Sequence, residues 1–430
     1  MLFVAALLFR MAFCALSGGL GQVSPGGYRE YAVAGAHLLR HGVILSPLVA
    51  DETAAVPSHL LPPAYVGIVA LAYRVFGVDS WGALLALQIL NALATSLAVV
   101  LVFFIARDLL GAAAGWAAAI VFAFNPAAVG FTNLIWDTAL FTCGVALCLW
   151  ASLRLARPPA RWPAWMRFGF LLGAVALLNP ALTVGYPLLV LYPLTAHFPG
   201  RWRAMAAPLV LTVSGWIIAI APWTLRNYRL FDELMYVRGG LMLELWLGVC
   251  PEAEQGSSAV YEGQYPLRND WQQQQLVKQG EAEYIHSRGV QAWAAIRDNP
   301  VRFARLCLRR TVDFWTGTVL SHMPPGHGFW PRSPARLMLA LFLLGETLLI
   351  VVWVVRCGAA SSPLGWLLGA AMASSLVYCL THTAVRFRAP LEPILTVGAV
   401  AGAVELYRIA TAARRRMVTV PAKPSREGSV

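Results

Sequence analysis

The sequence predicts an all-α fold, that of a polytopic helical membrane protein with about ten transmembrane helices. The chain of 430 residues is 58% hydrophobic and only 13% charged, whereas soluble domains are about 45–50% apolar and about 25% charged. Several apolar runs have the roughly 20 residues that are needed to cross a bilayer. These runs are continuous rather than alternating, so a β-barrel is not expected.

The N-terminal part combines one apolar run with two helices beside the membrane. The first run, Leu2–Leu20, is interrupted by Arg10, and we expect a retained anchor because no clear small-residue cleavage site follows it. Next, REYAVAGAHLLRHG has the spacing of a helix lying in the membrane interface. The segment PPAYVGIVALAYRVFG, from Pro62, is too short and too punctuated for a confident span, and predicts a second such helix.

Nine further apolar runs predict membrane spans, in two sets separated by a long polar region. The first set comprises Trp81–Ala106, Ala112–Phe124, Leu134–Leu153, Phe168–Leu178, Leu182–Leu194 and Met205–Trp223. The second set comprises Leu337–Val355, Leu364–Leu380 and Ile394–Tyr407. We therefore expect four parts: an N-terminal transmembrane core (1–225) with a first external loop (21–63), an external polar region (226–336), C-terminal transmembrane helices (337–411) and a basic cytoplasmic tail (412–430).

The distribution of arginines predicts the orientation. Three clusters lie in short loops or in the tail, and they consist of Arg154, Arg157, Arg161 and Arg167, then Arg201 and Arg203, then Arg414, Arg415 and Arg416. With about ten spans all three clusters fall on one side, which the positive-inside rule makes cytoplasmic, together with both termini. This pattern accounts for the net charge of +12, and without a recognition motif no nucleic-acid partner is expected.

With that orientation, four segments meet on one external face. They are Gly21–Pro63, the short turn Asn125–Asn133, the long polar region, and RFRAPLEP, which begins at Arg386. The active face of the protein is therefore expected outside the cytoplasmic membrane. Candidate site residues should lie in these four segments.

The polar region carries a basic helix and two cysteines. In NPVRFARLCLRRTVDFW, residues Arg302, Arg305 and Arg309 share one helical face. Such a helix either lies on the membrane with its arginines toward lipid phosphates or caps a small soluble unit. Cys250 and Cys307 could form a disulfide in an oxidising compartment, or remain free.

The segment RFRAPLEP predicts a phosphate site. Pro390 disfavours helix at Ala389, so the preceding residues are expected to be extended, and Arg386 and Arg388 would then point the same way. Two guanidiniums on one face can clamp a phosphate, and we group Glu392 with them. The alternative is that the arginines anchor the loop to lipid headgroups.

Acidic residues on the same face are candidates for a catalytic base, which would take a proton from an acceptor hydroxyl or amine. Glu30 follows the first span, and could instead pair with a neighbouring arginine. Asp137 lies at the external end of a span, where acids are costly, and could instead cap its helix. Asp51 and Glu52 lie in the first external loop, and could simply be loop acids.

A further pair of polar residues stands where the sixth span of the first set leaves the membrane. In PWTLRNYRLFDELMYV, Arg226 and Asn227 could reach the same phosphate, or anchor the helix to headgroups.

Taken together, these motifs resemble those of the bacterial GT-C membrane glycosyltransferases of family thirty-nine, which include protein O-mannosyltransferases and the lipid A aminoarabinose transferase. The matching motifs run in order along nearly the whole chain: GYREYAVAGAHLLRHG, LPPAYVGIVALAYRVFG, IWDTALF, APWTLRNYRLF, ELWLG and HTAVRFRAPLEPIL. The resemblance implies an inverting transferase that uses a polyprenyl-phosphate-linked sugar at the external membrane face. It also implies that the lipid phosphate lies near Arg386, Arg388 and Arg226.

The chain departs from the family pattern at one position. Members usually carry an aspartate four residues before the tyrosine of the first-loop helix, and here the residue four before Tyr31 is Gly27. Glu30 is the nearest acid. This departure leaves open whether a base is present for the standard mechanism.

The predicted function is the transfer of a sugar from a polyprenyl-phosphate donor to an envelope glycan, lipid or protein. Its partners would be that donor, membrane lipids and the envelope acceptor. Two alternatives are a non-catalytic relative that binds or scaffolds lipid-linked sugars and a transporter or flippase, although the inverted repeats common in transporters are absent. No cofactor is required by the pattern; the external acids could hold a divalent cation, but no oxygen-ligand cluster marks its site.

Overall fold

The computed structural model describes residues 1–22, 29–49, 56–318, 333–358 and 362–418, with side chains described as far as Arg414. Within these residues the secondary structure is helical, with a single isolated β-bridge between Leu45 and Pro57. The predicted all-α class is therefore confirmed.

Six helical segments among the described residues are long and apolar enough to cross a membrane. They are α4 (Trp81–Leu110), α7 (Thr138–Leu155), α10 (Ala206–Phe231) with the short turn before it, α16 (Pro334–Cys357), α17 (Pro363–Leu380), and α18 (Val385–Arg388) continuing through a 3-10 turn into α19 (Glu392–Val418). A seventh is a bent pair, in which α5 (Ala112–Ala123) meets the segment Pro126–Asn133 at 52°. The chain is thus a multi-pass membrane protein.

Other apolar helices are shorter than a full span. They are α1 (Leu2–Ser17), α3 (Pro63–Phe76), α8 (Trp162–Leu178) and α9 (Tyr186–His197). The predicted span Leu182–Leu194 is interrupted, because a 3-10 turn at Pro180–Gly185 precedes α9. Asn179 begins this turn, and its side chain accepts a hydrogen bond from the backbone N–H of Ala181.

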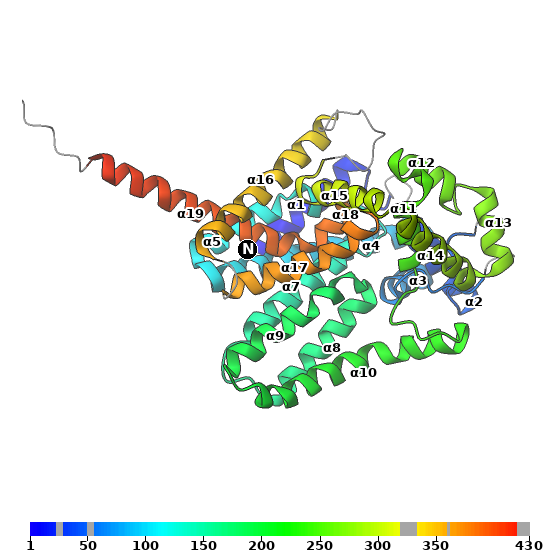
Figure 1. Cartoon of the computed structure of the whole chain (residues 1–430), viewed down its shortest axis with the longest axis horizontal. Coiled ribbons are helices and arrows are strands. Elements are labelled where there is room, and N and C mark those ends of the chain that lie inside the picture. Colours follow the sequence, from blue (N-terminus) through cyan, green and yellow to red (C-terminus); the bar gives the residue numbers. More distant parts are fainter. Residues whose placement is uncertain (23–28, 50–55, 319–332, 359–361, 419–430) are drawn as a thin grey trace, which may run out of the picture.

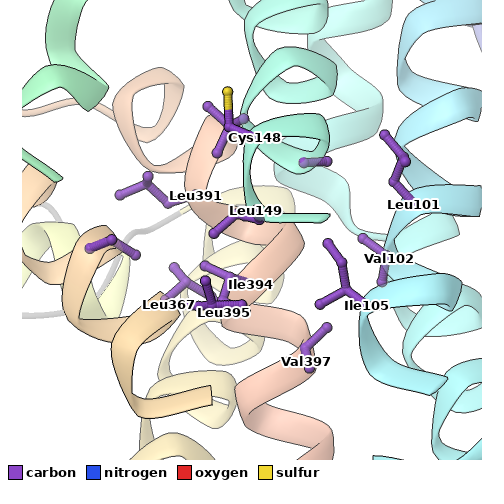
Figure 2. Close-up of a cluster of buried hydrophobic side chains, with 14 of the residues drawn as sticks. Leu101, Val102, Ile105, Cys148, Leu149, Leu367, Leu391, Ile394, Leu395 and Val397 are labelled. Atoms are coloured by element: carbon purple, nitrogen blue, oxygen red, sulfur yellow. The ribbon is translucent and has the colours of Figure 1, made fainter. Parts of the chain in front are cut away.

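The transmembrane core lies where α4, α7, α17 and α19 meet. Figure 2 shows their aliphatic side chains interdigitating. Val102, Ile105, Cys148, Ile394 and Leu395 are all completely buried there. Lipid tails are as apolar as these side chains, so close packing rather than the hydrophobic effect favours the association of the helices.

Helices α8 and α10 form the closest pair, beside α9 (Figure 1). Gly169 of α8 lies against the backbone of Thr212, and Gly215 of α10 lies against that of Met166. A methyl group at either glycine would overlap a carbonyl of the partner helix. Glycine is therefore required at both positions for this approach.

The long polar region folds into a helical unit at one end of the molecule, beside α2 (Glu30–His41) and α3 (Figure 1). Its helices are α11 (Leu241–Val249), α12 (Ser257–Gln264), α13 (Asp270–Gln279), α14 (Glu281–Asp298) and α15 (Pro300–Thr316). Residues Leu48, Val49 and Leu60 of the first loop belong to its buried core. The unit is thus built from two segments distant in sequence.

The basic helix α15 packs on this unit through Arg302 and on α16 and α17 of the bundle. Arg302 donates hydrogen bonds to the carbonyls of Val249 (2.7 Å) and Cys250 (2.9 Å), and its Nε lies 3.2 Å from Glu254. The side chain is therefore directed at the polar unit and not at lipid. Cys250 and Cys307 are both free thiols.

Candidate functional site

A buried carboxyl group is the centre of the candidate site. Asp137 immediately precedes α7 and is 2% exposed. Asn179 donates a hydrogen bond to its Oδ2 at 2.9 Å, and the hydroxyl of Tyr31 also contacts it. The carboxylate makes no capping hydrogen bond to α7, so the capping alternative does not apply.

Two arginines supply positive potential around this carboxyl group. Burial raises the pKa of Asp137, while the hydrogen bonds from Asn179 and Tyr31 and the charges of Arg238 and Arg386 oppose that rise. Both guanidiniums therefore lie close enough to Asp137 to favour its charged form.

Aromatic rings hold Arg386 in place. Its guanidinium lies over the ring of Trp136 at 5.1 Å and over that of Phe387 at 4.8 Å. The ring of Tyr31 meets Trp136 edge-on at 4.9 Å. Cation–π contacts of this kind orient a guanidinium while leaving its N–H groups able to donate.

Glu30 lies at the beginning of α2, in the same neighbourhood. The hydroxyl of Tyr265 donates to its Oε1 at 3.2 Å, and its other oxygen, Oε2, is buried without a hydrogen-bond partner among the described residues. Burial raises the pKa of Tyr265 most, and the charge of Glu30 raises it further. The charge of Glu244 also raises this pKa, whereas that of Arg386 lowers it. Glu30 and Arg386 therefore both lie close to Tyr265.

The polar unit and the last loop add a chain of polar contacts to this neighbourhood. Arg238 lies 3.8 Å from Glu244, which in turn lies 3.8 Å from Nδ1 of His382. The other ring nitrogen of His382 is 3.5 Å from the hydroxyl of Tyr261. Sequence reasoning did not identify Tyr31, Arg238, Glu244 or His382, because no spacing within their own segments links them to Asp137.

The four segments that were expected to meet do meet. Glu30 of the first loop contacts Tyr265 of the polar region. The charges of Arg238, from the polar region, and of Arg386, from RFRAPLEP, both act on the Asp137 carboxyl group. The short turn after α5 joins them, since Nδ2 of Asn125 donates to Glu392 at 2.8 Å.

The expected extended conformation of RFRAPLEP is wrong. Val385–Arg388 is a helical turn, and Ala389 is also helical. Successive helical residues are rotated by about 100°, so Arg386 and Arg388 point in different directions. The bias that a following proline exerts on Ala389 is overridden by the tertiary contacts of Arg388.

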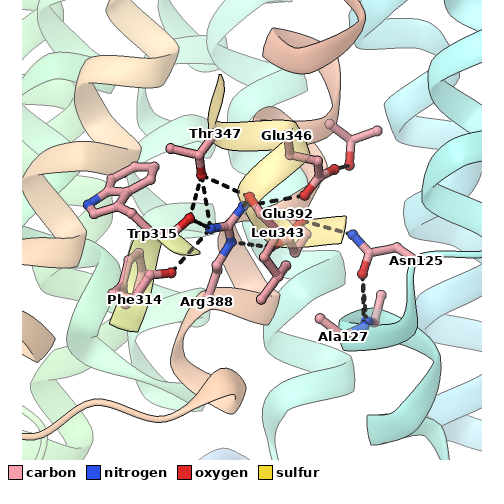
Figure 3. A network of polar contacts seen from close by, with 11 residues as sticks. Asn125, Ala127, Phe314, Trp315, Leu343, Glu346, Thr347, Arg388 and Glu392 are labelled. Carbon is pink, nitrogen blue, oxygen red and sulfur yellow. Dashed lines mark hydrogen bonds and ion pairs between the residues drawn. The ribbon is translucent and has the colours of Figure 1, made fainter. Parts of the chain in front are cut away.

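Arg388 is buried, and Figure 3 shows the polar contacts that surround it. Its Nε donates to Glu392 at 2.6 Å and its Nη2 lies 3.4 Å from Glu346. Further hydrogen bonds reach the carbonyls of Phe314, Trp315 and Leu343. Arg388 and Glu392 therefore join α15, α16 and α19, and the side chain of Arg388 is saturated by the protein itself.

The pair at the end of α10 fixes a loop. Arg226 donates to the carbonyl of Ser58 at 2.9 Å and to Asn227 at 3.0 Å, and stacks over Trp223 at 4.5 Å. Asn227 is fully buried and donates to the carbonyl of Val237 at 3.2 Å. Neither residue is among the groups that act on the Asp137 carboxyl group.

Two of the predicted site acids, Asp51 and Glu52, lie outside the described residues. Among the residues that the structure does describe, no group of three or more His, Cys, Asp or Glu side chains is arranged to hold a metal ion.

Part of the chain matches one known protein family. Residues 61–225 match the family model described as dolichyl-phosphate-mannose-protein mannosyltransferase. No curated protein matches the chain. The matched segment includes Asp137 and Asn179, whereas Glu30, Arg238 and Arg386 lie outside it.

Among solved structures, the fold is similar to that of the archaeal oligosaccharyltransferase AglB from Archaeoglobus fulgidus, solved in complex with an inhibitory peptide and a dolichol-phosphate. The TM-score is 0.56 at 14% sequence identity, and the match covers 98% of this chain and 52% of AglB. Its complex with Zn and sulfate gives a TM-score of 0.55 at 13% identity, with the same coverage of 98% and 52%. ArnT from Cupriavidus metallidurans bound to undecaprenyl phosphate gives a TM-score of 0.39 at 17% identity over 99% of this chain and 81% of that one.

These comparisons confirm the predicted resemblance to the GT-C glycosyltransferases. The likeness to AglB concerns the fold, and the chain spans about half of that protein's length, 52%. The TM-score for ArnT, 0.39, is too low to support a structural argument.

Proposed function

We propose that this chain, with its GT-C fold and its mannosyltransferase-like segment at 61–225, transfers a sugar from a polyprenyl-phosphate donor to an acceptor hydroxyl or amine. The observation that carries the proposal is a buried carboxyl group, Asp137, with two guanidiniums close to it. Phosphate binding and proton removal are the two tasks that such a transfer requires.

In the proposed reaction the bond between the sugar C1 and the phosphate oxygen breaks as the acceptor oxygen or nitrogen bonds to C1. The proton of the acceptor passes to a carboxylate, and the electron pair of the broken bond stays on the phosphate. We assign proton removal to Asp137, with Glu30 as the second candidate. Asp137 is preferred because burial raises its pKa, and a carboxylate with a raised pKa accepts a proton more readily.

Arg386 and Arg238 are the proposed ligands of the donor phosphate. Their charges would stabilise the negative charge that develops on the departing lipid phosphate. Arg388 and Glu392 are proposed as a support that holds the helical turn carrying Arg386, because their own hydrogen bonds are made within the protein.

The proposed location is the cytoplasmic membrane, with both termini in the cytoplasm and the site on the external face. The arginine clusters of the short loops support this orientation. The polar unit lies beside the site through Tyr265 and Glu244, and we assign recognition of an envelope acceptor to it. No step of the proposal passes through a metal ion.

The test measures binding and turnover separately. Purified protein in detergent is incubated with an undecaprenyl-phosphate sugar, which is a phosphodiester, and the retained intact donor is measured by native mass spectrometry. Arg386→Gln should weaken binding at least about tenfold, since a charge-assisted hydrogen bond contributes about 1.5–3 kcal/mol. Asp137→Asn should retain binding and lose transfer in an assay with a panel of polyprenyl-phosphate sugars.

Arg203→Gln is the matched control, because Arg203 is an exposed arginine that stacks on Trp202 at 5.1 Å, in the turn before α10 and away from the site. Binding by Arg386→Gln equal to that of this control would contradict the phosphate assignment. Normal transfer by Asp137→Asn would contradict the assignment of the base.

A second candidate function is a non-catalytic relative that binds lipid-linked sugars. The observation in its favour is that Gly27 occupies the position where family members usually carry an aspartate. This candidate predicts lipid binding that depends on Arg386, without turnover of any donor. Transfer by the purified protein would eliminate it.

A further inference from the structure

A cavity lies at the end of α10, apart from the residues around Asp137. It has a volume of about 400 Å³. Its apolar walls are Leu38 near the end of α2, Val43 and Ile44 just after that helix, Pro63 at the start of α3, and Trp223 and Leu230 near the end of α10. Two arginines of α10, Arg226 and Arg229, complete the lining. An apolar pocket with a few polar groups is the usual form of a small-molecule site.

Arg226 is held rigidly in this pocket. Its Nη1 is used by the carbonyl of Ser58 and by Asn227, and its plane is stacked on Trp223. Its Nη2 is buried and has no hydrogen-bond partner among the described residues. A guanidinium fixed in this way leaves one donor group for a ligand in the pocket.

Arg229 adds a second positive charge one helical turn further along. It is exposed, and it forms no hydrogen bond or ion pair with the described part of the chain. The acid that affects Arg226 most is Glu281, which is occupied by hydrogen bonds from the hydroxyl of Ser58 and the backbone N–H of His59, both 2.8 Å. Glu281 does not line the pocket, whose described lining residues include two arginines and no Asp or Glu, so the charge of the lining itself is positive.

The surroundings of the pocket are those of a membrane surface. The most apolar stretch of α10 is only 28% buried inside the protein, so most of it faces lipid. Leu225, Tyr228 and Leu230 are exposed at the end of this helix, next to Arg226 and Arg229. A ligand here would place a charged head against the arginines and an apolar chain along α10.

We infer that this pocket binds the head of a long-chain lipid phosphate monoester, at a site separate from the Asp137 centre. Trp223 forms the wall between them: it lines the pocket, and it packs on the cluster that contains Tyr31 and Tyr65. Its Nε1 donates to the carbonyl of Val237 at 2.7 Å, and Val237 precedes the Arg238 that lies near Asp137.

The charge of the pocket selects the type of phosphate. Two guanidiniums with no acid among the described lining residues match a monoester dianion better than a phosphodiester, which carries a single negative charge. The pair Arg238 and Arg386, by contrast, lies beside the Asp137 carboxyl group. A polyprenyl-phosphate sugar is a phosphodiester, and the lipid that remains after transfer is a monoester. In terms of the proposed function, on which this last step alone rests, the pocket receives the spent carrier lipid.

The experiment uses the full-length protein in detergent and a farnesyl monophosphate that carries a benzophenone group. After irradiation, labelled peptides are mapped by mass spectrometry. Labelling is expected in the segments 38–44 and 223–230, and Arg226→Gln/Arg229→Gln should reduce it at least about tenfold. Undecaprenyl monophosphate should compete better than dioleoyl phosphatidylglycerol.

Two controls separate this inference from the proposed function. Arg201→Gln/Arg203→Gln removes two charges before the other end of the same helix, and Arg386→Gln removes the proposed donor ligand; both should keep the labelling. Labelling elsewhere only, or unchanged in Arg226→Gln/Arg229→Gln, would overturn the inference whatever the outcome at Arg386. Equal competition by phosphatidylglycerol would overturn the preference for a monoester.

Discussion

At the scale of single residues, two arginines of one short segment have opposite environments. Arg386 lies over the rings of Trp136 and Phe387, near Asp137. Arg388, two positions later, is 1% exposed and pairs with Glu346 and Glu392. The same residue type therefore serves as a candidate ligand at one position and as an internal support at the other, depending on which way the backbone turns.

His59 gives a prediction at this scale. It is 2% exposed, packed against Phe231 at 4.7 Å and closely against Gly239, and burial lowers its pKa to about 4. In the unfolded chain its pKa is about 6.5. Between these values the unfolded state binds the proton preferentially, so the stability that depends on neutral His59 is fully present above pH 6.5 and is lost as the pH falls towards 4.

The loss is limited to about 3 kcal/mol, since one pKa unit corresponds to about 1.36 kcal/mol. Thermal unfolding of the wild type and of His59→Gln should therefore converge as the pH is lowered from 7 to 4. His286→Gln, at an exposed position on α14, is the control and should keep the acid sensitivity of the wild type. A constant difference between wild type and His59→Gln at all pH values would contradict the assignment.

At the scale of elements, buried ion pairs and close backbone contacts decide how helices join. Arg388 connects α15 and α16 to the beginning of α19, and Thr396 adds a hydrogen bond to Glu346 at 2.8 Å. Gly402 of α19 lies against the backbone of Leu349 in α16. This junction positions the turn that carries Arg386.

Removing the cation from this junction should be costly. Arg388→Met leaves Glu346 and Glu392 without their positive partner in a buried site, and breaking a buried ion pair in this way typically costs about 3–5 kcal/mol. The midpoint of thermal unfolding in detergent should fall strongly for Arg388→Met and stay close to the wild-type value for Arg386→Gln. Adding Glu392→Leu to Arg388→Met should restore part of the loss.

The double-mutant comparison distinguishes the ion pair from simple loss of packing. Recovery in Arg388→Met/Glu392→Leu is expected only if unpaired charge is the main penalty. Equal melting of Arg388→Met and wild type would contradict the role assigned to Arg388.

At the scale of the whole molecule, the helical bundle and the polar unit share one boundary. The first loop contributes Leu48, Val49 and Leu60 to the core of the polar unit. Glu281 of α14 holds the hydroxyl of Ser58 in that loop. The site lies at this boundary, where α2, the start of α7, the polar unit and the last loop come together.

The orientation of the bundle can be tested with one native cysteine. Cys357 is exposed at the end of α16, which the arginine distribution places at the cytoplasmic side. Ser258 is exposed on α12 of the polar unit, on the opposite side. In intact cells a membrane-impermeant maleimide should label Ser258→Cys in a Cys307→Ser/Cys357→Ser background, and should leave Cys307→Ser, which retains Cys357, unlabelled.

Permeabilisation of the cells should then expose Cys357 to the same reagent. Labelling of Cys357 in intact cells would reverse the assigned orientation and place the polar unit in the cytoplasm.

The sequence by itself determined the helical class, the membrane environment, the position of the long polar region and the identity of Asp137, Glu30 and Arg386 as candidates. These properties follow from composition and from runs of residues in the chain, because the affinity of a segment for lipid is a sum over its own side chains. The likeness to GT-C enzymes was visible for the same reason, in short local motifs.

Only the tertiary structure decided which side chains face the site. Glu30 meets Tyr265 across 235 positions and Asn125 meets Glu392 across 267, and no local pattern encodes such pairs. The rotation of Arg388 away from Arg386 depends on carbonyls of Phe314 and Trp315. The direction of a side chain is set by contacts that exist only after the helices have packed, and these contacts overrode the local preference of the residue before proline.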